Sequence, residues 1–324
     1  MEISVNQSHF FEAKPDLSIL ESAKKASLTL DHSCLSGRCS ECKVKVVSGD
    51  FDMPNTQEGL SEKEVQEGYC LSCITKPLSD MELEEVNFIE GVFPEVKIIP
   101  AKISSLDFLS ADVAKLSLRI PPNKFLDFIP GQYINLSIRN IKRSYSISSI
   151  PSDSIIELFI KKYQLGKFSY YLFNEAKVND LLRIEGPNGT YILPKTLPRS
   201  IIFISTGTGI APNLSLIRSA IRDRKINKNR ITVIHGQRYA HEHIYQLEKI
   251  LPGIKIIKVI SREHKIGFTK GYVQDQIIKL DLPINENLIF ACGNSQMIKE
   301  LYSQLSSMGL CNRNFKADYF VPSS

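Results

Sequence analysis

No stretch of this chain approaches the roughly 20 consecutive apolar residues that a membrane-spanning helix needs, so no membrane segment is expected. The start, Met1 to Val5, lacks the basic and apolar regions of a secretory signal, which predicts a cytoplasmic protein. Low-complexity tracts and internal repeats are also missing. The charge is mixed, with 40 Lys and Arg against 35 Asp and Glu. A net charge of +5 spread in this way gives no reason to expect nucleic acid as a partner.

The 324 residues are more than one hydrophobic core usually organises, so two or three domains are expected. Seven cysteines lie in a chain that shows no export signal. In a reducing cytoplasm, clustered cysteines bind metal more often than they pair as disulfides.

Three of these cysteines, Cys34, Cys39 and Cys42, fall within nine residues, and Cys73 follows at a distance. The spacing C-x4-C-x2-C with a distant fourth cysteine is that of plant-type 2Fe-2S centres. A structural zinc site is the alternative, because Cys39-x2-Cys42 and Cys70-x2-Cys73 also make a C-x2-C pair of pairs. That interpretation gives Cys34 no role, and it would fit a non-enzymatic interaction protein.

The first segment, residues 1–92, predicts a β-grasp-like alternation of strands and short helices. Ile3 to Phe11 and Val44 to Ser48 have the composition of strands. Ser18 caps a short amphipathic helix, and Ser61-Glu-Lys-Glu64 has the spacing of a capping box.

The second segment, residues 97–196, follows a linker at Gly91 to Pro94 and predicts an antiparallel barrel. Pro100 is expected to end its first apolar run, and a helix opens at Gly166. Four stretches alternate apolar and polar residues at period two: Ala114–Ile120, Tyr133–Ile138, Ser144–Ile147 and Ile155–Lys161.

The third segment, residues 199–324, changes to a β-α-β rhythm, which predicts a Rossmann-like parallel sheet with helices on both faces. Its apolar strand candidates are Ser200–Ser205, Ile231–His235, Ile254–Ile260 and Leu288–Cys292. The chain as a whole is therefore expected to be multidomain, of α+β and α/β class.

Two short motifs mark the predicted barrel. In Arg143-Ser-Tyr145-Ser146 the arginine can hold a phosphate, the tyrosine can stack on a flat ring, and a serine can hydrogen-bond a ring nitrogen. Gly166-Lys-Phe-Ser169 offers free N–H groups at a helix start, which suits a pyrophosphate. Taken alone, the first motif also fits a half-exposed strand and the second a simple helix cap.

Further motifs mark the predicted parallel sheet. Thr206-Gly207-Thr208-Gly209 stands between a strand and a helix, where dinucleotide pyrophosphates bind, although Pro212 departs from the G-x-G-x-x-G pattern. The alternative is a purely structural glycine turn. Further on, Cys292-Gly-Asn follows a strand, and Asp318-Tyr-Phe320 lies near the C-terminal end; a buried thiol and a packed aromatic are the simpler interpretations.

Together these motifs resemble the ferredoxin–NADP reductase superfamily, and the resemblance covers nearly the whole chain. It implies a 2Fe-2S cluster held by four of the cysteines, FAD on the barrel, and NAD(P)H on the parallel sheet. By this resemblance the flavin contacts come from the barrel motifs, the pyrophosphate turn is the Thr-Gly-Thr-Gly stretch, and a cysteine and an aromatic lie near the nicotinamide and flavin. The implied residues are, for the metal, Cys34, Cys39, Cys42 and Cys73; for cofactors, Arg143, Tyr145, Ser146, Gly166, Ser169, Thr206, Gly207, Thr208, Gly209, Ser261 and Arg262; and for catalysis, Ser146, Cys292 and Phe320.

The implied activity is that of an electron-transfer enzyme. Hydride would pass from NAD(P)H to FAD, and single electrons would leave through the cluster to a protein acceptor. The order of domains resembles two groups: reductases of nucleotide-sugar (CDP-6-deoxyhexose) 3-dehydrase systems, and reductase components of mono- and dioxygenases. The stretch Ile103 to Ile160 looks closer to the first group.

The sequence leaves two points open: which nicotinamide cofactor is used, and whether a pair of histidines binds metal. Ser261-Arg262 with Tyr272 suits a 2′-phosphate, while Gly271-Tyr-Val resembles the turn of NADH-using enzymes, so NADH and NADPH are both retained. His241-Glu-His243 resembles a metal pair without a third ligand, and a solvated helix start is the expectation.

Overall fold

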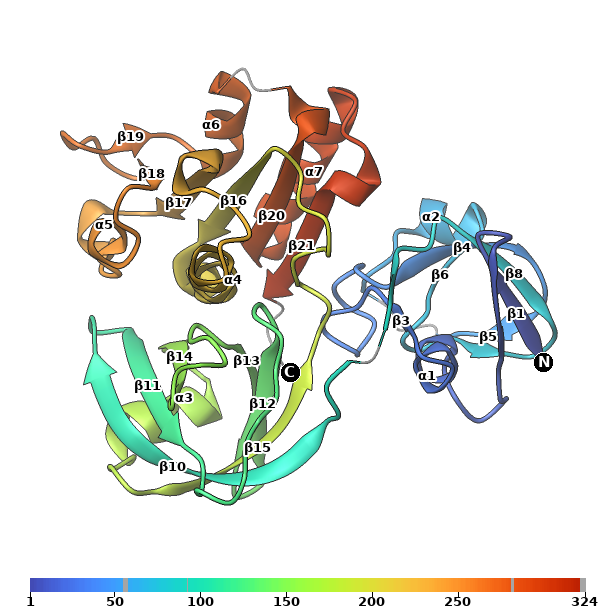
Figure 1. The fold of residues 1–324 in the computed structure, drawn as a ribbon, viewed down its shortest axis with the longest axis horizontal. Helices are drawn as coiled ribbons and strands as arrows, with labels where there is room; N and C mark the ends of the chain where they lie inside the picture. Colours follow the sequence, from blue (N-terminus) through green and yellow to red (C-terminus); the bar gives the residue numbers. More distant parts are fainter. Residues whose placement is uncertain (55–57, 92, 281–282, 321–324) are drawn as a thin grey trace. The chain divides into compact units, whose positions relative to one another are not determined.

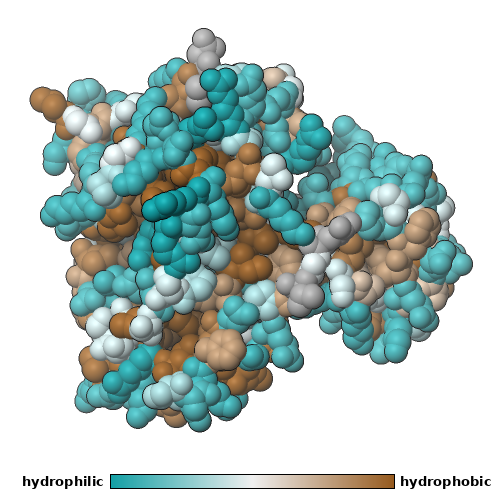
Figure 2. All heavy atoms as spheres, in the orientation of Figure 1, coloured by the Kyte–Doolittle hydropathy of each residue, from teal (hydrophilic) through white to brown (hydrophobic). Residues whose placement is uncertain are grey.

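The computed structural model describes residues 1–54, 58–91, 93–280 and 283–320. These residues form two compact units (Figure 1). The first comprises Met1–Phe93 together with Gly189–Tyr191, and the second comprises Pro94–Asn188 and Ile192–Ser324. Figure 2 shows hydrophilic side chains over much of the visible face of each unit, with hydrophobic ones between them. Among the described residues, every helix is too short or too polar to cross a membrane.

The first unit is built on a five-stranded mixed sheet in the order β2-β1-β8-β4-β6. Helix α1 (Ile19–Lys25) buries Ile19, Leu20 and Ala23 in the same core as the sheet residues Ile3 and Leu83. A mixed sheet packed against a helix confirms the β-grasp expectation. The other elements are β1 (Glu2–Val5), β2 (His9–Glu12), β3 (Leu28–Leu30), β4 (Lys43–Ser48), β5 (Phe51–Asp52), α2 (Glu62–Gln66), β6 (Tyr69–Leu71), β7 (Lys76–Pro77), β8 (Met81–Glu84) and β9 (Phe88–Glu90).

Local signals place the helices of this unit correctly but miss a turn. Ser18 and Ser61 each accept a hydrogen bond from the N3 backbone, and both capping boxes are complete. The stretch from Ile3 to Phe11 is strand as expected, but a turn that was not predicted divides it into β1 and β2, which form an antiparallel hairpin. The reversal is made by Asn6 and Gln7, both at positive φ, without the glycine that usually announces such a turn.

The barrel of the second unit is a six-stranded antiparallel sheet in the order β13-β12-β15-β10-β11-β14. A bridge between Ile147 and Leu158, just past the end of β13, nearly closes it. Its core is mostly aliphatic, and α3 (Lys167–Asn174) adds the aromatic Phe168 and Leu172 to it. The strands are β10 (Lys97–Phe108), β11 (Val113–Arg119), β12 (Tyr133–Ile138), β13 (Ile141–Ser146), β14 (Ile156–Lys161) and β15 (Leu181–Asn188).

Pro100 does not end a strand as predicted. It lies inside β10, opposite Arg183 of β15. Strand β11 pairs with β10 only from Lys102 onward, so within the described strands Pro100 has a ladder partner on one side of β10 and none on the other. A proline, which has no N–H to donate, is tolerated where a strand is paired on one side.

The rest of the second unit is a six-stranded parallel sheet in the order β19-β18-β17-β16-β20-β21. Helices α6 and α7 pack on the face that carries Ile202, Ile204 and Ile289. The strand order reverses between β16 and β20, and ligands of such sheets bind at the carboxyl ends of the strands beside that point. The elements are β16 (Ser200–Thr206), α4 (Ile210–Arg222), β17 (Ile231–Gln237), α5 (Leu247–Ile250), β18 (Lys255–Ile260), β19 (Thr269–Lys270), α6 (Val273–Lys279), β20 (Asn287–Asn294), α7 (Ser295–Ser307) and β21 (Phe315–Phe320), with short 3₁₀ turns at 207–209, 228–230, 240–242, 284–286 and 312–314.

Candidate functional site

The cysteine loop of the first unit is wound so that its amides face sulfur. Leu35, Gly37 and Ser40 all have positive φ. The amides of Ser36 and Arg38 each approach the Cys34 sulfur at 3.4 Å. Gly37 has a φ of 73°, in the left-handed region where glycine is favoured, and a Cβ there would also meet the end of the Ile74 side chain at 2.6 Å.

The four predicted ligands meet as two pairs. The Cys34 amide lies 3.4 Å from the Cys39 sulfur, and the Cys42 and Cys73 sulfurs are 3.2 Å apart. The pKa of Cys34 is lowered to about 5, first by the hydrogen bond from the Cys39 thiol and then by the neighbouring Ser36 and Arg38 groups. Cys34 therefore favours thiolate, the form that binds metal, whereas the hydrogen bond to Cys34 and then burial raise the pKa of Cys39.

The arrangement of the four cysteines as two pairs fits two metal ions better than one. A single zinc would draw four sulfurs to one point, about 3.8 Å from each other. Cys70, which the zinc interpretation requires, is fully buried in the core, where burial raises its pKa to about 12. The donor set thus suits two irons, each taking two thiolates.

The predicted flavin contacts lie on β13 and at the start of α3. Arg143 is half-buried, and its guanidinium donates to the Lys142 carbonyl at 2.7 Å. The Tyr145 ring lies 5.4 Å from that of Phe168, and burial raises the pKa of its hydroxyl. Ser146, at the end of the strand, is 7% exposed.

The two predicted residues of the α3 turn behave differently. Gly166 is the N-cap, and no side chain caps the helix or places an acid in its first turn. The Ser169 hydroxyl, by contrast, donates to the Gly166 carbonyl at 2.9 Å and accepts from the Tyr163 amide at 3.2 Å. Ser169 therefore closes the turn, and the open amides of the helix start are what remain for an anion.

A second uncapped helix start follows the Thr-Gly-Thr-Gly stretch. Helix α4 begins after Gly209 with neither a side-chain cap nor an acid in its first turn. A Cβ on Gly209 would lie 2.4 Å from the Cys292 carbonyl oxygen, and one on Gly293 would lie 2.5 Å from the Thr206 hydroxyl. Two neighbouring strand ends are therefore packed so closely that only glycine fits. Thr208 is buried, whereas Gly207, at φ 57°, has open space around it.

The barrel and the parallel sheet contribute to one group of side chains. Ser146 donates to Asp318 Oδ2 at 3.1 Å, and the Cys292 thiol lies 3.8 Å from the same oxygen. Burial, followed by the Asp318 carboxylate, raises the pKa of Cys292 well above its ordinary value, so it stays a thiol. The sequence marked Ser146 and Cys292 but gave Asp318 no role. The sequence pattern that pointed to Asp318 was an acid two residues before the aromatic Phe320.

Three other predicted residues lie at strand ends. Phe320 ends β21 and is partly exposed, opposite Asn294 in register. Ser261 and Arg262 follow β18, and their amides bond the carbonyls of Gln237 and Arg238 at 3.1 and 2.9 Å. Arg262 is therefore beside Arg238 at the carboxyl edge of the sheet.

The histidine expectation is half wrong. His241 is exposed, as a solvated turn requires. His243 is only partly exposed; its Nε2 lies 3.0 Å from the Val259 oxygen, and its ring packs on Phe268 and on the fully buried His235. Burial lowers the pKa of His235 to about 3. These rings belong to the packing of the sheet.

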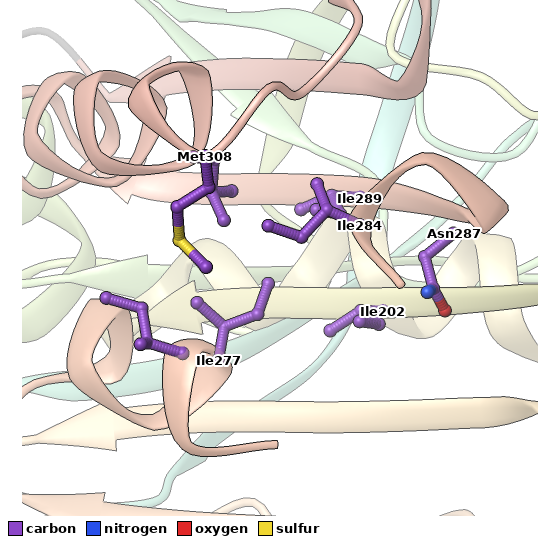
Figure 3. A pocket seen from close by; sticks show the side chains of 8 residues that line it. Ile202, Ile277, Ile284, Asn287, Ile289 and Met308 are labelled. Carbon is purple, nitrogen blue, oxygen red and sulfur yellow. The ribbon is translucent and has the colours of Figure 1, made fainter. Parts of the chain in front are cut away.

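A small cavity of about 40 Å³ also lies in the parallel-sheet domain (Figure 3). Its lining is mostly isoleucine, and the Asn287 amide already donates to the Pro283 carbonyl at 2.7 Å. Asn287 begins β20, whereas Cys292 lies near the end of the strand. The cavity is thus a packing gap at the opposite end of the strands from the candidate site.

Comparison with known proteins identifies three domains along the chain. Residues 3–78 match the 2Fe-2S iron-sulfur cluster binding domain. Residues 100–192 match the oxidoreductase FAD-binding domain, and residues 203–302 match the oxidoreductase NAD-binding domain. The match to the 2Fe-2S domain supports iron–sulfur over zinc.

Relatives match nearly the full length. The chain is 34% identical to CDP-6-deoxy-L-threo-D-glycero-4-hexulose-3-dehydrase reductase of Yersinia pestis, covering 94% of this chain and 93% of that protein. It is 29% identical to a reductase component of naphthalene 1,2-dioxygenase/salicylate 5-hydroxylase systems from Ralstonia, over 96% and 95%. The crystal structure of a cytochrome P450 reductase from Amycolatopsis shares the fold, with a TM-score of 0.77, 22% identity and complete coverage of both chains. The chain therefore belongs to the family of iron–sulfur flavoprotein reductases that join a 2Fe-2S domain to FAD-binding and NAD-binding domains, and it is an NAD(P)H-dependent electron-transfer enzyme.

Proposed function

We propose that this reductase delivers electrons from NAD(P)H to a nucleotide-sugar 3-dehydrase that acts on a CDP-6-deoxyhexulose. The acceptor is inferred from the Yersinia pestis relative, which is 34% identical over 93% of its length. FAD, when bound, would accept a hydride, and with it two electrons, from NAD(P)H. The cluster would carry electrons onward one at a time. Free cysteines throughout the described chain suit work in the reducing cytoplasm.

The observation that carries the reductase chemistry is the group Ser146, Cys292 and Asp318. It joins the end of a barrel strand to the carboxyl ends of two sheet strands, which is where a flavin on the barrel and a nicotinamide on the sheet would meet. The Ser146 hydroxyl and the neutral Cys292 thiol both donate toward Asp318, so the Ser146 oxygen would be left in a fixed direction as a hydrogen-bond acceptor. Phe320, at the end of β21, would cover the flavin until nicotinamide arrives.

The remaining predicted residues would hold the cluster, FAD and the nicotinamide dinucleotide. Cys34, Cys39, Cys42 and Cys73 would bind the two irons. Arg143, Tyr145 and the uncapped start of α3 at Gly166 would hold FAD, with Ser169 shaping that turn. The Thr206–Gly209 turn and the start of α4 would take the dinucleotide pyrophosphate. Ser261 and Arg262 would lie at the adenosine end.

Reconstitution with defined acceptors tests the proposal. Purified reductase would be mixed with NADH or NADPH, a CDP-6-deoxyhexulose 3-dehydrase and its nucleotide-sugar substrate, and 3-deoxygenated product would be measured. We expect product only when all components are present. The control replaces the dehydrase with the oxygenase and ferredoxin components of a naphthalene-type dioxygenase. Faster turnover with those components than with the dehydrase would show that the acceptor is an oxygenase.

A further inference from the structure

A segment of three residues belongs to the first unit although it comes from far along the chain. Gly189–Tyr191 follows β15 directly, yet it packs with Met1–Phe93. Thr190 and Tyr191 are 2% and 4% exposed. The barrel's last strand therefore continues, through one peptide bond, into a buried part of the cluster domain.

Three hydrogen bonds within this unit join Thr190 to a single residue, His32. The His32 amide donates to Thr190 Oγ1 at 2.8 Å, and that hydroxyl donates to the His32 carbonyl at 3.0 Å. The Thr190 amide reaches the same carbonyl at 3.2 Å. We call this set the His32–Thr190 clasp. The hydroxyl both accepts and donates, a pattern that alanine or valine cannot reproduce.

The clasp is rigid and lies close to the cysteine loop along the chain. His32 is 7% exposed, and its Nδ1 is held 2.8 Å from the Leu30 carbonyl at the end of β3. Two residues further on is Cys34, the first predicted ligand. Buried hydrogen bonds in a low-dielectric interior are strong, so the backbone at His32 has little freedom.

From this connection we propose that Thr190 is a positioning residue for electron transfer into the cluster, which rests on the proposed function. Electron coupling falls off less steeply through covalent and hydrogen bonds than through space. The clasp provides a route of that kind from β15 to the Cys34 loop. One electron, supplied originally by NAD(P)H, moves from the reduced flavin to the oxidised cluster, and no covalent bond changes.

The test replaces Thr190 with valine, which keeps the shape and removes the hydroxyl, and with serine, which restores it. Anaerobic stopped-flow mixing with NADH or NADPH would follow flavin and cluster reduction at their separate absorbance bands. We expect flavin reduction to be unchanged in Thr190→Val, and cluster reduction to slow about tenfold, a factor equivalent to about 1.4 kcal/mol. Thr190→Ser should recover most of the rate.

A second measurement does not depend on turnover. Hydrogen exchange on the oxidised enzyme should show faster exchange of the His32 amide in Thr190→Val, because its acceptor is gone. The matched control is Thr29→Val, which makes the same substitution at a buried threonine of the same unit outside the clasp. It should change neither the cluster rate nor the His32 amide.

Rates are compared per intact cluster, from iron and sulfide content, so partial cluster loss does not obscure the result. The proposal is overturned if Thr190→Val reduces its remaining clusters at the wild-type rate, or slows flavin and cluster reduction equally. Failure of the proposed function would look different, because an enzyme that serves another protein acceptor would still pass electrons from flavin to cluster, and the Thr190 variants would still change that rate.

Discussion

Asp318 accepts a hydrogen bond at 3.1 Å from the hydroxyl of Ser146, which lies 172 residues earlier in the chain. One residue is on the last strand of the parallel sheet and the other on the barrel. The bond fixes the direction of the Ser146 hydroxyl at a point where the barrel meets the parallel sheet.

Ser146→Ala should therefore slow NAD(P)H-dependent ferricyanide reduction with little change in KM. We expect kcat to fall about tenfold, the effect of losing about one neutral hydrogen bond, because the oxygen that Asp318 orients would be gone. Ser144→Ala is the matched control on the same strand, because the Ser144 hydroxyl donates to Asn135 instead. Equal losses in both variants would contradict a specific role for Ser146.

Two variants, Cys39→Ser and Cys70→Ala, should distinguish a cysteine that binds the cluster from one that only packs in the core. We expect Cys39→Ser to lose the iron–sulfur absorbance and the reduction of a one-electron protein acceptor, while the flavin still reduces ferricyanide. Cys70→Ala should keep the cluster and cost about 1 kcal/mol of unfolding free energy, as small buried truncations do. Iron and sulfide analysis with both acceptor assays checks this. Equal loss of both activities in Cys39→Ser would refute the electron order.

Gly209→Ala should damage nicotinamide binding far more than Gly207→Ala. The added Cβ at Gly209 meets the Cys292 backbone at 2.4 Å, and backbone cannot move aside as a flexible side chain can. At Gly207 the Cβ meets nothing within 4 Å, so only the left-handed conformation is penalised, by about 1 kcal/mol. Titration of NAD(P)H binding and thermal unfolding would be compared, and similar behaviour of the two variants would disprove the close approach.

Arg143→Ala should weaken FAD retention about tenfold or more, because a charged hydrogen bond to phosphate would be lost. Lys142→Ala removes the neighbouring positive charge, which pairs with Glu185 at 2.7 Å, and should leave FAD binding nearly unchanged. The dissociation constant is measured by flavin fluorescence on the deflavinated protein. A fully flavinated Arg143→Ala enzyme would exclude the phosphate role.

The ionised Glu64 carboxylate should stabilise the folded first unit in a way that acid removes. Partial burial alone would raise its pKa, but Lys43 at 2.7 Å and the Ser61 cap outweigh burial and lower the pKa to about 2. Because the folded pKa is below the unfolded value of about 4.3, the stabilisation is present at neutral pH and fades as pH falls from about 4.5 to 2.

Glu64→Gln should accordingly cost about 0.5–1 kcal/mol of unfolding free energy at neutral pH. Urea unfolding followed by circular dichroism would show the difference from wild type shrinking by about pH 3. A difference that is constant over this range would mean that the charge of Glu64 does not contribute.

Short-range patterns predicted much of this structure because their physics is local. The capping boxes of Ser18 and Ser61 and the period-two strands of the barrel depend on neighbours within a few residues. The hairpin at Asn6 and Gln7 was missed because the pair lacks the glycine of a usual hairpin turn, and Pro100 misled because strand pairing on one side is decided by the distant β11.

Long-range contacts also limited what the sequence could predict about the candidate site. Ser146, Cys292 and the Asp318-Tyr-Phe320 motif could be marked from sequence, but the contacts of Asp318 with the other two could not, because tertiary folding makes them. The ligand contact suggested for Ser169 stays a prediction, and the structure adds that its hydroxyl bonds the Gly166 carbonyl of its own turn.

The membership of Gly189–Tyr191 in the first unit bears on how this protein can be dissected. Truncation of the chain after Phe93 would remove the partner of the His32 amide and carbonyl, leaving two backbone groups to find water in a buried place. The first unit is thus discontinuous in sequence although its 2Fe-2S match spans only residues 3–78, and a recombinant exchange of residues 1–93 alone would keep His32 while changing the threonine segment that it binds.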